Sequence, residues 1–120
     1  AWERDERAAA LGVGEAQYNL GNMHRDGQGG PQDFTRAREL YELAAAQGHA
    51  EAMINIGALF FYGQGVEQDL NEAMRWFLKA KAHGRDVSQF VAGVMEARMS
   101  QNAQSHETRF LDQHQVRRWR

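Results

Sequence analysis

The chain has 120 residues, a formal net charge of −2 and no cysteine. A charge this close to neutral gives little attraction to nucleic acid or to a membrane surface, and a chain without cysteine has no disulfides, thiolate metal sites or cysteine nucleophiles. No run of roughly 18 apolar residues occurs, so the sequence predicts no membrane-spanning helix.

The first twelve residues look like the end of a repeat. Ala8, Ala10 and Gly12 match three residues that lie 36 positions later, namely Ala44, Ala46 and Gly48. Two interpretations are open: residues 1–12 form a polar capping helix, or the chain was cut from a longer array. The missing initiator methionine favours cutting or processing.

The next two segments are copies of each other. Residues 14–48 and 50–84 are identical at 13 of 35 positions, without a gap. A fixed period of about 20 to 50 residues indicates an array of stacked repeats.

Each copy predicts two helices. In the second copy, apolar residues at helical spacing predict a first helix from about residue 52 to 62, and Gly63 and Gly65 end it. Asp69 stands at an N-cap position with Glu72 three residues later, so a second helix is expected from about residue 70 to 83. Asp33 is the equivalent cap in the first copy.

Glycine also occurs in the middle of the predicted first helices. Gly21, Gly57 and Gly93 are spaced by 36 residues, although glycine costs about 1 kcal/mol in a helix interior relative to alanine. We expect each of them to allow close approach of the paired helix, with large side chains packed around the gap.

The pattern weakens after Gly84. Residues 85–104 read as a partial third repeat, with a turn expected at Asn102–Ser105 and a last helix over 106–118. Phe110 and Trp119 are expected to cover the apolar end of the third helix, because a terminal repeat needs a cap.

Several motifs resemble the Sel1-like repeat, a relative of the tetratricopeptide repeat. The first copy contains YNLGNMH, GQGGPQD and ARELYELAAAQG, and the second contains INIGALF, GQGVEQD and AMRWFLKAKAHG. The resemblance implies an all-α fold, a right-handed superhelix of antiparallel helix pairs, and a role as an adaptor in protein complexes. We accordingly divide the chain into a capping or partial repeat (1–12), repeat one (13–48), repeat two (49–84), a partial third repeat (85–104) and a C-terminal cap (105–120).

Catalytic chemistry has little support in the sequence. The five histidines show no HExxH motif and no i, i+4 pair, so we expect no metal, no cofactor and no enzymatic activity. Some cysteine-rich relatives are linked to β-lactam binding, which leaves a β-lactam-binding or β-lactam-hydrolysing enzyme as one alternative. A purely structural segment of a larger array is the other.

The favoured hypothesis is a scaffold that binds a protein or peptide partner and neither binds nucleic acid nor inserts into a membrane. The inner faces of the first helices should form a concave groove, and asparagine, which both donates and accepts, suits an extended peptide. Asparagine at positions 19 and 55 can equally serve helix packing. Cytoplasm and periplasm of a bacterium both fit the composition. The predicted partner-binding residues are Asn19, Asn22, Asp26, Asn55, Tyr62 and Arg98.

Overall fold

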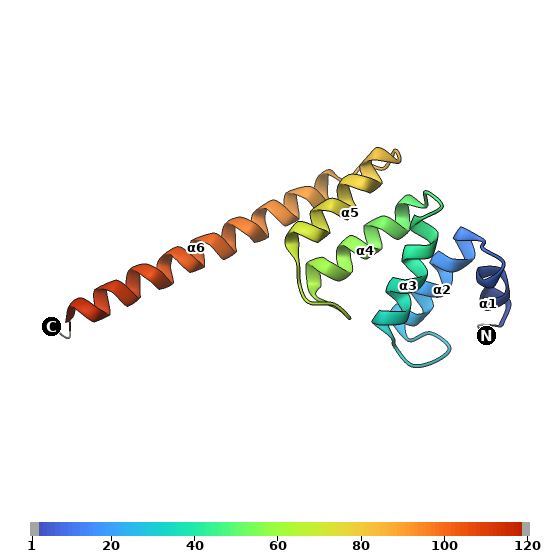
Figure 1. Ribbon diagram of the computed structural model, residues 1–120, viewed down its shortest axis with the longest axis horizontal. Helices are drawn as coiled ribbons and strands as arrows, with labels where there is room; N and C mark the ends of the chain where they lie inside the picture. Colours follow the sequence, from blue (N-terminus) through green and yellow to red (C-terminus); the bar gives the residue numbers. More distant parts are fainter. Residues whose placement is uncertain (1–2, 119–120) are drawn as a thin grey trace.

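The computed structural model describes the backbone of residues 3–118 and the side chains of residues 6–103. Within residues 3–118 all regular structure is helical, so the predicted all-α class is confirmed. The elements are α1 (Glu3–Ala10), α2 (Gly14–Asp26), α3 (Phe34–Ala45), α4 (Ala50–Tyr62), α5 (Leu70–Ala82) and α6 (Ser88–Arg118). Figure 1 shows two helix pairs, α2 with α3 and α4 with α5, side by side along an elongated array that ends in the long helix α6.

The second helix of each pair begins at an aspartate, as predicted. The carboxylate of Asp33 accepts a hydrogen bond from the backbone N–H of Arg36 at 2.9 Å, and that of Asp69 accepts one from Glu72 at 3.0 Å. Each bond satisfies a backbone donor that the first helical turn leaves without a partner. In α5 the carboxylate of Glu72 pairs with Arg75, so Asp69 alone caps the N-terminus of this helix.

The loop inside each pair is also fixed by side chains that the two copies share. The first helices end at Gly27 and Gly63, whose φ angles of 71° and 68° lie in the left-handed region that glycine adopts without strain. The amides of Gln32 and Gln68 each donate to a carbonyl near the end of the preceding helix, at 2.8 Å. The repeated glutamine–aspartate pair therefore ends one helix and begins the next.

Glycine brings the paired helices into close contact at two of the three predicted positions. A Cβ atom added to Gly21 would lie 2.7 Å from the ring of Tyr41, and one added to Gly57 would lie 2.5 Å from the ring of Phe77. The prediction was wrong for Gly93, where a Cβ atom would meet nothing within 4 Å. In the described part of the chain no second helix packs on this residue, because α6 continues without a turn from Ser88 to Arg118.

The expected turn at Asn102–Ser105 is likewise absent, and α6 runs unbroken from Ser88 to Arg118. Figure 1 shows this helix extending past the end of α5 and away from the two pairs. The predicted packing of Phe110 and Trp119 lies outside the described side chains. The capping role of residues 105–120 stays a prediction.

The contrast between two glycines gives a test of this packing. Gly57→Leu is expected to lower the free energy of unfolding by about 1–3 kcal/mol, because overpacking pushes Phe77 away from α4. Gly93→Leu is expected to leave it unchanged or raise it by up to about 1 kcal/mol, because leucine forms helix better than glycine and meets open space. Urea unfolding followed by circular dichroism measures both, and an equal loss in the two variants would contradict the close contact at Gly57.

Candidate partner-binding surface

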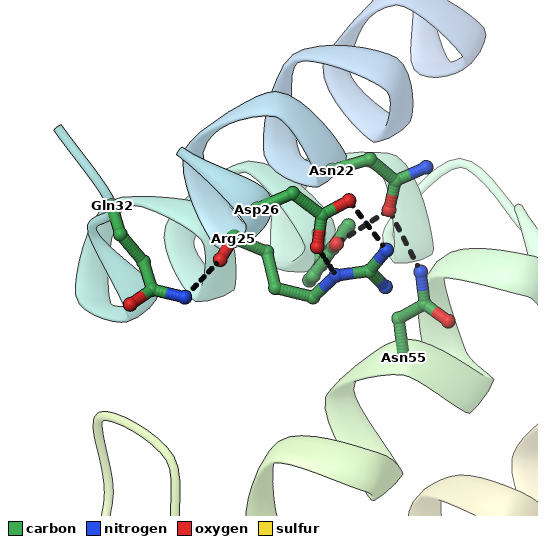
Figure 2. A network of polar contacts seen from close by, with 6 residues as sticks. Asn22, Arg25, Asp26, Gln32 and Asn55 are labelled. Atoms are coloured by element: carbon green, nitrogen blue, oxygen red, sulfur yellow. Dashed lines mark hydrogen bonds and ion pairs between the residues drawn. The ribbon is translucent and has the colours of Figure 1, made fainter. Parts of the chain in front are cut away.

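A polar network joins the first two repeats. Asn22 of α2 accepts two hydrogen bonds at Oδ1, one from the hydroxyl of Tyr41 at 2.5 Å and one from Nδ2 of Asn55 at 3.0 Å. Figure 2 shows the Asn22 and Asn55 side chains meeting between α2 and α4. Tyr41 is fully buried and both asparagines are half-buried. The network therefore fixes the position of α4 against α2.

Burial determines the protonation state at the centre of this network. Removal from water disfavours the phenolate and raises the pKa of Tyr41 to about 12. The hydroxyl therefore keeps its proton at any physiological pH and acts as a donor to Asn22.

A second polar pair lies one turn further along α2. The guanidinium of Arg25 donates to both carboxylate oxygens of Asp26, at 2.9 and 3.0 Å, as Figure 2 shows. This hydrogen bonding raises the pKa of Arg25 and lowers that of Asp26. Because both side chains are partly exposed to solvent, the pair contributes at most about 1 kcal/mol to stability and stays accessible.

The same positions are apolar between the second and third repeats. At an offset of 36 residues, Tyr41 becomes Phe77, Asn22 becomes Ala58 and Asp26 becomes Tyr62. The Tyr62 side chain is 68% exposed and packs edge-on against Phe61, with ring centroids 5.0 Å apart. It lines a hollow of about 160 Å³ whose walls include Ala58, Phe61, Tyr62, Phe77, Phe90 and Gly93.

The six predicted site residues lie in different places. Asn22 and Asn55 meet directly, whereas Asp26 pairs with Arg25 and Asn19 is exposed on α2. Tyr62 lies at the apolar hollow. Arg98 lines a separate hollow of about 360 Å³, together with polar residues from the start of α5.

Two features of this surface were not predicted from the sequence. Arg25 was not among the predicted site residues, because the adjacent Asp26 is its only signal in the sequence. Phe90 stacks on Phe77 with ring centroids 5.2 Å apart. Phe90 follows the aromatic Tyr18 by two repeat lengths in the sequence, but this spacing does not indicate its stacking partner. Val94, at the position equivalent to Ala58, is fully buried and belongs to the hydrophobic core.

Among the residues that the structure describes, no three histidine, aspartate or glutamate side chains gather to hold a metal ion. In that same part of the chain, every helix is too short or too polar to cross a bilayer.

The stacked helix pairs define a helical-repeat protein. The family model for the Sel1 repeat matches residues 14–49 and 50–84, so the chain belongs to the Sel1-repeat family. Proteins of this family commonly act as protein-interaction scaffolds, and their fold is typically non-catalytic. A search among curated proteins found no match.

Solved structures of Sel1-repeat proteins are similar to this chain. One is c5321 of uropathogenic Escherichia coli, described as a protective antigen, with 38% identity and a TM-score of 0.65 over 68% of this chain. Another is a Sel1 repeat protein of Oxalobacter formigenes, with 35% identity and a TM-score of 0.62 over 67% of this chain. The chain spans only 17% and 33% of the length of these two proteins.

A third structure shares the fold at lower identity. The Helicobacter pylori cysteine rich protein B is 22% identical, with a TM-score of 0.68 over 78% of this chain and 68% of that protein. At this identity the likeness concerns the fold alone.

The buried tyrosine gives a test that depends on pH. Its pKa is about 12 in the folded protein and about 10 in an unfolded chain, so the folded state holds the proton more tightly. This contribution to stability is complete below about pH 10 and is lost as the pH rises toward about 12. Wild-type protein should lose up to about 2–3 kcal/mol of unfolding free energy through this group, and Tyr41→Phe should lose none through it.

Chemical unfolding of the two proteins from about pH 8 to pH 12 measures the difference. Phenylalanine already occupies the equivalent position 77, so the variant is expected to fold, at a cost near neutral pH of about 0.5–1.5 kcal/mol for the lost hydrogen bond. Parallel stability curves for the two proteins would contradict the burial of a protonated hydroxyl.

Proposed function

We propose that this chain is a protein-interaction scaffold that binds a peptide or protein partner on the surface formed by α2, α4 and α6. The observation that carries the proposal is the 68% exposure of Tyr62 at the rim of an apolar hollow. A tyrosine in this position offers apolar ring area and a polar tip to a partner, and such residues are frequent centres of binding energy.

The asparagines support the proposal by their fixed geometry. Asn22 uses Oδ1 and Asn55 uses Nδ2 in their mutual hydrogen bond, which leaves Nδ2 of Asn22 as a donor and Oδ1 of Asn55 as an acceptor. Figure 2 shows these two atoms directed to the same side of the pair. A donor and an acceptor held side by side suit the main chain of an extended peptide, and Asn19, exposed on α2, continues this polar surface.

The charged side chains of this surface would orient the partner more than they would strengthen its binding. Asp26 and Arg98 are exposed and carry opposite charges, and their contribution to binding is screened by salt because they lie in contact with water. The centre of the proposed surface is uncharged, so binding is expected to depend only weakly on ionic strength. No observation on the described residues favours the alternative of a β-lactam-binding enzyme.

Tyr62→Ala is the direct test of this proposal. The partner is first captured from a bacterial lysate by the whole chain and identified by mass spectrometry, and its affinity is then measured by calorimetry with purified proteins. Tyr62→Ala is expected to weaken binding by about 2 kcal/mol or more, the loss typical of a central interface residue. Asn55→Ala is expected to cost about 0.5–1.5 kcal/mol, the net contribution of one hydrogen bond.

Leu43→Ala is the matched control, because Leu43 is a large apolar residue on α3 that is also about half exposed, at 51%. It should bind as the wild type does, and Tyr62→Ala and Leu43→Ala, whose side chains are largely exposed, should keep the wild-type melting temperature. Equal binding by Tyr62→Ala and wild type would overturn the proposal. If the whole chain captures no partner, the result would favour the alternative that it is a purely structural segment of a larger array.

A further inference from the structure

The start of α4 is capped by a histidine. Nδ1 of His49 accepts a hydrogen bond from the backbone N–H of Ala52 at 3.3 Å. The bond satisfies one of the backbone donors that the first turn of a helix leaves without a partner. An imidazole nitrogen accepts only while it carries no proton, and both ring nitrogens are donors in the charged form. This cap therefore exists only while His49 is neutral.

The same ring lies against α2, the first helix of repeat one. It stacks on Tyr18 with ring centroids 4.7 Å apart, and Nε2 of His49 lies 3.9 Å from Oε2 of Glu15. This distance is too long for a hydrogen bond but is within the reach of an ion pair once the imidazole is charged. His49 therefore holds α4 through one ring nitrogen and faces a carboxylate of α2 with the other.

The next joint of the array divides these two contacts between two residues. Arg85 stands 36 positions after His49 and forms an ion pair with Glu51 of α4, and its guanidinium is always charged. The start of α6 has a separate cap, because the carboxylate of Asp86 accepts a hydrogen bond from the backbone N–H of Ser88 at 3.0 Å. Hydrogen bonds from the hydroxyl and the backbone N–H of Ser88 lower the pKa of Asp86, so this cap stays an acceptor at mildly acidic pH. The contacts of the second joint therefore do not depend on an imidazole.

Two further groups that can carry a charge lie near this histidine. The ring of His83, at the end of α5, lies against Gly48, where an added Cβ atom would be 3.5 Å from it. Its Nδ1 lies 3.0 Å from a backbone oxygen of α5. The carboxylate of Glu51 pairs with Arg85. Across the joint, the carboxylate within ion-pair distance of the imidazole is that of Glu15.

We propose that His49 is a pH-sensitive switch between the first two repeats, which caps α4 when it is neutral and, when protonated, releases the N–H of Ala52 and pairs with Glu15 of α2. Imidazole is the side chain whose charge ordinarily changes between about pH 5 and 8. A positive charge is unfavourable at the N-terminus of a helix, so the charged ring turns from α4 toward the carboxylate. The exchange is nearly balanced, because a helix cap and a solvent-exposed ion pair each contribute modestly to stability.

The switch acts on the surface that is proposed to bind a partner. Asn22 of α2 and Asn55 of α4 are joined by a hydrogen bond between the same two repeats. A change in how the start of α4 is held is expected to alter the spacing of these two asparagines. This regulatory role rests on the proposed function, whereas the exchange of bonds at His49 does not.

NMR spectroscopy of the isotope-labelled whole chain between about pH 5 and 8 tests the exchange. The imidazole nitrogen signals of His49 report its protonation. The amide proton of Ala52 is expected to move upfield along the same titration curve, because it loses its acceptor, and the carboxylate carbon of Glu15 is expected to follow that curve as well. An Ala52 amide or a Glu15 carboxylate that does not follow His49 would overturn the inference.

Two variants separate the switch from other titrations. His49→Asn keeps a cap, because asparagine is among the best N-cap residues, and it gains no charge, so the Ala52 amide should keep its position across the pH range. His83→Gln is the matched control, because it removes a histidine that lies at the same joint, and both curves should stay as in the wild type. Movement of the Ala52 amide in His49→Asn, or its loss in His83→Gln, would contradict a switch at His49.

The effect on binding is measured by calorimetry with the partner captured by the whole chain. Wild-type protein should bind that partner about threefold or more weakly at pH 5.5 than at pH 7.5, and His49→Asn should change by less than about twofold. Equal pH dependence in the two proteins would overturn the regulatory role. Binding that depends on Tyr62, with an Ala52 amide that does not move, would support the scaffold and overturn the switch. An Ala52 amide that follows His49, with no partner that depends on Tyr62, would do the reverse.

Discussion

The array depends on the contact between a glycine in the first helix of each pair and an aromatic ring in the second. At Gly57 the missing side chain lets the ring of Phe77 lie against the backbone of α4, where even one added carbon would lie 2.5 Å away. Glycine costs about 1 kcal/mol in a helix interior, and burying the phenylalanine ring contributes about 1.5–3 kcal/mol. The balance favours the close pair, and the spacing within the pair then sets where the next helix can pack.

The identity of the ring decides the character of the interface with the following repeat. Tyr41 introduces a buried hydroxyl that requires a partner, and Asn22 and Asn55 supply a bonded pair around it. Phe77 introduces no such requirement, and Ala58 and Val91 stand at the two asparagine positions. The hydroxyl oxygen of Tyr41 therefore accounts for the polar interface between repeats one and two. Phe77 lacks this oxygen, and the interface after repeat two is apolar.

Much of this architecture could be read from the sequence because it is local or periodic. The 36-residue offset predicted the pairs, and Asp33 and Asp69 predicted where the second helices begin. The Asn22–Asn55 contact was not predicted, because it joins different copies at a separation of 33 residues that no period shows. The turn at Asn102–Ser105 was predicted from polar residues alone, and without glycine or proline there nothing interrupts the helix.

The two interfaces between repeats differ in polarity, and the exposed surfaces at the two ends of the array differ in the same way. Near α2 the exposed surface is polar. Its polar side chains are already partly hydrogen-bonded within the protein, Asn22 to Asn55 and Arg25 to Asp26. α6 also exposes large apolar side chains, since Phe90, Met95 and Met99 are 40%, 55% and 70% exposed. Burying apolar area is the main source of binding energy, whereas a polar group exchanges water for a partner with a small net gain. Affinity is therefore expected to come from the α4–α6 end, and the polar end would fix the orientation of whatever binds there.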